Sequence, residues 1–228
     1  MNTNIKSTRL KFIALGISYL FHPVFILYYI FISLSFISPV DFIFSDKKQW
    51  TALNSMIIGM SVFFPIVSIL AMRASGLIKN LRLSEAKDRI GPMIASIIFY
   101  IWLFLNYRRF DTGPEIFEAN ILGATMALCF SFFINNFSKI SLHAVGAGGL
   151  LGTIGVFRVV FGNDVYKILF GAYELHISPD IFLAVIVIIT GMIGTSRLYL
   201  KTHKPADIYG GYLLGFVSQL MAYILIKI

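Results

Sequence analysis

The segment from Ser196 to Asp207 carries the side chains best suited to chemistry. His203 and Asp207 are four residues apart, so a helix would place both on one face. A carboxylate beside an imidazole fixes the tautomer of the ring and raises its nucleophilicity. Arg197 offers a planar fork for phosphate oxygens, and Pro205 suits the first turn of a following helix. These residues indicate a nucleophilic histidine in a phosphate site rather than ordinary basic residues at a helix end.

A second candidate histidine, His143, closes the sequence Ile-Ser-Leu-His. Ser141 in that sequence would make a good helix N-cap, and the free amides of a helix N-terminus bind anions. The run of small residues from Gly146 to Gly149 would let neighbouring helices pack closely. Ser141 could be only a cap and the glycines only packing residues, but capping and packing are also compatible with a role in anion binding. For His143, the presence of His203 favours a role in the same site.

Two arginines form a third candidate group. Arg82 and Arg89 are seven residues apart, nearly two helical turns, so they would share a helix face. Two cations on one face at a membrane boundary suit a phosphate. A solvated basic segment that meets anionic lipid headgroups would have the same composition. Both interpretations of this pair remain open.

The pattern from Ser196 to Asp207, S-R-x5-H-x3-D, resembles the third signature of the type 2 phosphatidic acid phosphatase superfamily, the lipid phosphate phosphatases. Ser141 and His143 match two positions of the second signature, Pro-Ser-Gly-His, whose proline and glycine are missing here.

The first signature of that superfamily is Lys-x6-Arg-Pro. Arg82 and Arg89 have its spacing, with arginine in place of lysine, and Pro92 follows two residues late. The resemblance covers about residues 79–215. One matching signature and two degenerate ones leave open whether catalysis is intact.

The resemblance implies a membrane phosphatase without metal or cofactor that hydrolyses a phosphomonoester or pyrophosphate of a membrane lipid. His203 would form a phosphohistidine, Asp207 would orient it, and His143 would protonate the leaving oxygen. The phosphoryl oxygens would be held by Arg82, Arg89, Ser141 and Arg197. A catalytically impaired lipid-phosphate binding or transport protein is the alternative. We expect no nucleic-acid partner, and the oligomeric state stays open.

Composition identifies the kind of fold that must position these residues. The chain of 228 residues is 57% hydrophobic and 13% charged, whereas soluble domains are about 45–50% apolar and about 25% charged. Lipid must therefore cover much of its surface. The single cysteine, Cys129, excludes an internal disulfide and a cysteine metal site.

Apolar stretches predict an all-α integral membrane protein with one domain, residues 1–228, and a bundle of six to seven transmembrane or membrane-embedded helices. The stretches are 12–37, 53–72, 91–106, 118–134, 144–161, 180–195 and 208–226. The third and fourth are short for a span of about 20 residues, so they predict short spans or a hairpin. His22-Pro23 predicts a kink rather than a ligand, and Gly211 and Gly215 predict close helix packing.

An even number of stretches separates the three candidate groups, so all three should lie on one side of the membrane. That side would carry twelve of the nineteen Lys and Arg residues: Lys6, Arg9, Lys11, Arg73, Lys79, Arg82, Lys87, Arg89, Lys139, Arg197, Lys201 and Lys204. Cytoplasmic loops are enriched in Lys and Arg, and the first span usually dominates orientation. We therefore expect a bacterial inner-membrane protein whose site faces the cytoplasm.

Overall fold

The computed structural model describes residues 2–37, 47–81, 83, 85–110, 113–162, 165–170 and 173–228. Its elements are α1 (Asn2–Leu20), α2 (Pro23–Ile37), α3 (Lys47–Ile58), the π-helical η1 (Gly59–Phe63), α4 (Phe64–Ala74), α5 (Ala86–Phe110), α6 (Glu115–Asn135), α7 (Leu142–Val160), β1 (Tyr166–Phe170), β2 (Tyr173–Ile177), α8 (Pro179–Tyr199) and α9 (Pro205–Lys227).

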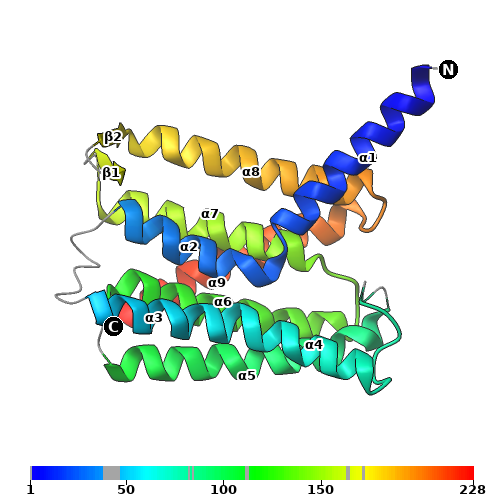
Figure 1. Cartoon of the computed structure of the whole chain (residues 1–228), viewed down its shortest axis with the longest axis horizontal. Coiled ribbons are helices and arrows are strands. Elements are labelled where there is room, and N and C mark those ends of the chain that lie inside the picture. The colour runs from blue at the N-terminus through cyan, green and yellow to red at the C-terminus, as the bar shows by residue number, and fades with distance from the viewer. Residues whose placement is uncertain are drawn as a thin grey trace.

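The predicted all-α membrane bundle is confirmed. Six helices in the described residues are long and apolar enough to cross a membrane, or seven if the bent pair α1 and α2 forms one span. The helices lie side by side and alternate in direction (Figure 1). The N-terminus lies toward the same end of the bundle as the α4–α5, α6–α7 and α8–α9 connections, and the β hairpin and the C-terminus lie at the other (Figure 1). Arg89, His143 and His203 therefore lie at one end.

The kink predicted at His22-Pro23 is a full break in the helix. α1 ends at Leu20, α2 begins at Pro23, and the two axes differ by 65°. Proline lacks the N–H that would continue the helical hydrogen bonds, and its ring clashes with the preceding turn. The first apolar stretch is therefore two helices that form a broken span or a re-entrant loop.

The stretches 91–106 and 118–134 are parts of longer helices than their apolar lengths suggested. α5 has 25 residues and α6 has 21, because the charged residues at their ends continue the helix beyond the apolar run. Their lengths remove the reason to expect a short hairpin. Strand structure was not expected, but β1 and β2 form a short antiparallel hairpin at the far end of the bundle.

Helix α7 lies in the centre of the bundle and packs against α9, α8, α2 and α6. Glycines make its contact with α9 close. A Cβ atom on Gly211 would lie 2.9 Å from the carbonyl oxygen of Ser141, and one on Gly215 would overlap the carbonyl oxygen of Val145. The predicted packing role of Gly211 and Gly215 is thus confirmed, and it brings the chain before α9 next to the start of α7.

Candidate functional site

His203 and Asp207 lie where α8 turns into α9. Nδ1 of His203 is 3.4 Å from Oδ2 of Asp207, and the same oxygen accepts from the backbone N–H of Lys204 at 3.0 Å. The two residues do not share a helix, because α9 begins at Pro205, the residue that the sequence favours for a first turn. Asp207 instead faces back over the N-terminus of α9 while it caps that helix. A carboxylate only accepts, so Nδ1 of His203 carries the proton and Nε2 has the free lone pair.

The environment of His203 keeps the ring neutral. Its side chain is 5% exposed, and this burial lowers the pKa of His203 to about 4, helped by the positive charges of Arg197, Lys139 and Arg89. The hydrogen bond to Asp207 acts in the opposite direction but is outweighed. A neutral, buried imidazole with a free Nε2 is suited to nucleophilic attack.

Ser141 is the N-cap of α7, as the sequence indicated. Its Oγ accepts from the backbone N–H of Ala144 at 3.4 Å, and its side chain is completely buried. Its own backbone N–H donates to the carbonyl oxygen of Asp207 at 3.2 Å. Ser141 therefore joins the segment around His143 to the segment from Ser196 to Asp207, but it is not one of the residues that line the cavity described below.

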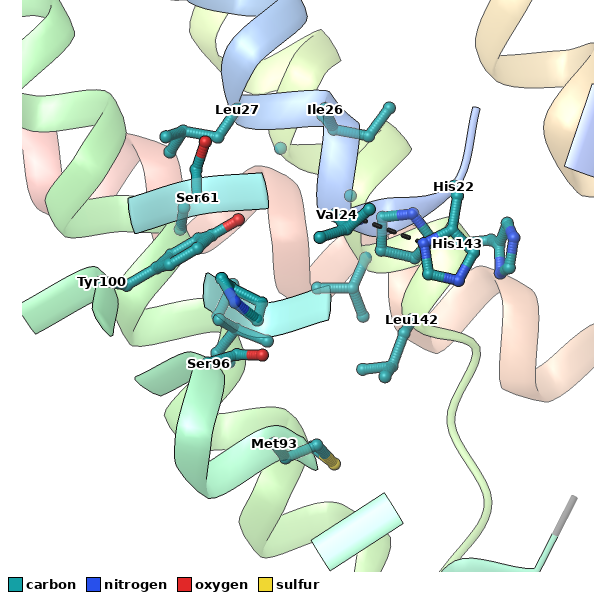
Figure 2. Close-up of a pocket in the computed structure, with 18 of the residues that line it drawn as sticks. His22, Val24, Ile26, Leu27, Ser61, Met93, Ser96, Tyr100, Leu142 and His143 are labelled. Carbon is teal, nitrogen blue, oxygen red and sulfur yellow. Dashed lines mark hydrogen bonds between the residues drawn. The ribbon is translucent and has the colours of Figure 1, made fainter. Parts of the chain in front are cut away.

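His143 lies in the first turn of α7 and is oriented by α1. Its Nε2 is 3.0 Å from the carbonyl oxygen of Ser18. A carbonyl oxygen only accepts, so Nε2 of His143 carries a proton and Nδ1 is the nitrogen left for other partners. The ring also packs edge-on against His22, with centroids 5.3 Å apart and planes at 81°, and the two lie next to each other in Figure 2.

Arg89 and Arg197, two of the three predicted arginines, lie beside the histidines. Arg89 donates through Nε to the carbonyl oxygen of Leu83 at 2.8 Å, and Nη1 of Arg197 donates to Oγ of Ser18 at 3.3 Å. Both side chains line the cavity with His143 and His203. The structure thus brings Arg89 and Arg197 together with both histidines, while Arg82 lies outside the described residues.

One end of a cavity of about 200 Å³ is surrounded by Arg89, His143, Arg197 and His203, and the cavity continues between the helices. Further in, its walls are mostly apolar and include Leu27, Ile30, Ala124 and Leu128. Tyr100 also lines it (Figure 2), and Tyr100 lies roughly 16 Å along α5 from Arg89 at 1.5 Å per residue. The cavity therefore combines a cationic end, formed by residues near helix termini, with an apolar interior.

Three residues at the site were not predicted. His22 lines the cavity, Ser18 contacts both His143 and Arg197, and Lys139 adds positive charge near His203. A signal for His22 was present, because an ionisable residue inside an apolar span usually has a functional partner. No sequence signal identified Ser18, whose role comes from the packing of α1 against α8.

Comparison of the chain with protein-family models, with curated proteins and with solved structures finds no match. Within the described residues, no group of three or more His, Cys, Asp or Glu side chains is placed to hold a metal ion.

Proposed function

We propose that the protein is a lipid phosphate phosphatase that hydrolyses a phosphomonoester or pyrophosphate of a membrane lipid through a phosphohistidine. The observation that carries this proposal is the position of His203. Its ring is neutral, backed by Asp207 and next to the cationic end of a cavity whose interior is apolar. The cationic end suits a phosphate group, and the apolar interior suits the chain of a lipid.

Each of these residues has a role in the proposed mechanism. Nε2 of His203 attacks phosphorus, the bond from phosphorus to the leaving oxygen breaks, and Asp207 stabilises the positive ring through Nδ1–H. To donate to the leaving oxygen, His143 must bind a second proton on Nδ1 while the carbonyl oxygen of Ser18 holds its Nε2–H. The negative charge of the bound phosphate would favour that second proton. Neutral His143 then accepts a proton from water, which attacks the phosphohistidine and releases phosphate. Arg89 and Arg197 neutralise the phosphoryl oxygens.

The test is release of phosphate by the purified protein from a panel of lipid phosphates, with and without a metal chelator. We expect turnover that survives the chelator and is abolished by His203→Ala. His176→Ala is the matched control, because that histidine is exposed on the hairpin at the opposite end of the bundle. A His203→Ala variant that remains active, or activity that needs a divalent metal, would contradict the proposed mechanism.

One observation favours a second function, a lipid-phosphate binding or transport protein on the same scaffold. The Ser141 hydroxyl caps α7 instead of facing the cavity, so it does not serve as the predicted phosphate ligand. Nε2 of His143 and Nη1 of Arg197 each already donate to Ser18. Saturable binding of a lipid phosphate without release of phosphate would support this second function.

We also propose that the site faces the cytoplasm of a bacterial inner membrane. The support is the excess of Lys and Arg on the segments at the site end, together with Lys6, Arg9 and Lys11 before the first apolar stretch.

A further inference from the structure

His22 lies at the break between α1 and α2, where its side chain caps the second helix. Its Nδ1 accepts from the backbone N–H of Val24 at 3.4 Å, and Pro23 occupies the first position of α2. In a neutral imidazole only one nitrogen carries the proton, so Nε2 of His22 is an N–H donor. In the described part of the chain, nothing is hydrogen-bonded to this Nε2.

The surroundings of His22 indicate which kind of partner this donor binds. The His22 ring packs edge-on against His143, and both rings line the cavity together with Arg89, Arg197 and His203. A polar N–H inside a membrane bundle is costly unless it has a hydrogen-bond partner. The cavity is where such a partner would bind, and its cationic end selects an anion.

We infer that His22 is a further substrate-binding residue, whose Nε2–H donates to an oxygen of the bound phosphate group. The inference rests on the proposed function, because it takes the same site as a phosphate site. His22 supplies a neutral donor beside the arginines, and it ties the broken first span to the chemistry. The break then has a purpose, because an unbroken helix over residues 8–37 could not present His22 as both a cap and a ligand.

Two substitutions separate the nitrogens of His22. The amide of asparagine reaches the position of Nδ1 and can cap α2, whereas the longer glutamine places its N–H near the position of Nε2. If His22 binds phosphate, His22→Asn should weaken binding of inorganic phosphate by roughly tenfold to a hundredfold, the usual value of a hydrogen bond to a charged group, and His22→Gln should stay close to wild type. If His22 only caps α2, His22→Asn should bind inorganic phosphate more tightly than His22→Gln, because only asparagine keeps the cap.

The experiment measures the Kd for inorganic phosphate by calorimetry on the purified proteins, with thermal unfolding to check that each variant folds. Phosphate release from lipid phosphates is measured in parallel. Equal binding by all three proteins, stronger binding by His22→Asn than by His22→Gln, or no binding by the wild type would each overturn the inference. A wild type that binds phosphate with the expected order of variants but releases none would overturn the proposed function and leave the phosphate site intact.

Discussion

Two separate effects of its surroundings act on the ring of His203. Asp207 fixes the proton on Nδ1 through a contact of 3.4 Å, while burial and surrounding cations disfavour a second proton on the ring. The first effect directs the lone pair of Nε2, and the second keeps that lone pair available. Each effect can be removed separately by substitution.

We expect Asp207→Asn to lower kcat/KM on the order of 10³-fold, because the amide keeps an oxygen but loses the charge that stabilises the imidazolium. That oxygen can still accept from the backbone N–H of Lys204, which lies 3.0 Å from Oδ2 of Asp207 in the wild type. α9 should therefore keep its cap. Steady-state kinetics and thermal unfolding in detergent check both parts. A loss of activity below about tenfold would mean that Asp207 serves only as the helix cap.

The pH profile is the second test at this scale. In the proposed mechanism the neutral ring is the nucleophile, so kcat/KM should fall on the acid side only as the pH approaches the pKa of His203, about 4. Lys139 is one of the cations that lower this pKa, and its Nζ donates to the carbonyl oxygen of Thr202 at 2.8 Å. Lys139→Gln should therefore raise the pKa and move the acid limb of kcat/KM to higher pH. A wild-type acid limb near 6.5, the ordinary histidine value, would contradict this account.

At the scale of elements, the contact between α7 and α9 sets the distance between the two histidines. His143 belongs to the first turn of α7, and His203 directly precedes α9. Glycine at the crossing lets the two backbones meet, since any larger side chain would contact main-chain atoms that cannot rotate away.

Gly215→Ala should separate these helices. Its Cβ would overlap the carbonyl oxygen of Val145 and lie 2.7 Å from the backbone nitrogen of Gly149, a case of overpacking that costs about 1–3 kcal/mol. We expect a lower unfolding temperature together with a loss of activity. Gly210→Ala is the control on the same helix, because nothing lies within 4 Å of its new Cβ, and it should leave both properties unchanged. Equal behaviour of the two variants would show that the crossing does not limit the site.

At the scale of the whole molecule, the bundle separates a site end from a hairpin end. Lys79 lies in the α4–α5 connection at the site end, and Lys167 lies in β1 at the hairpin end. Labelling these two positions therefore shows which end of the bundle faces the cytoplasm.

Single cysteines at Lys79 and Lys167 in a Cys129→Ala background should label differently with an impermeant thiol reagent in intact cells. If the site faces the cytoplasm, Lys167→Cys reacts at once and Lys79→Cys reacts only after the membrane is made permeable. The reverse order places the site outside the cytoplasm. Equal labelling of both positions in intact cells would contradict the arrangement of the bundle.

The sequence alone determined the features that depend on composition and local spacing. The low charge content required lipid around the helices, the apolar stretches located the spans, and the even number of spans placed the segments around Arg89, His143 and His203 at one end. Ser141 was recognisable as a cap, and Gly211 and Gly215 as packing residues, because capping and close packing need particular residue types at particular positions.

Only the tertiary structure decided which groups touch. It placed the Ser141 hydroxyl at the cap of α7 and away from the cavity, and it brought Ser18 and His22 of the first apolar stretch to His143. The contacts of Ser18 and His22 with His143 join residues more than one hundred positions apart, and they depend on the 65° bend between α1 and α2. The sequence shows that Pro23 must interrupt the helix, but the direction that the chain takes afterwards is set by packing against α7 and α8, which no local pattern records.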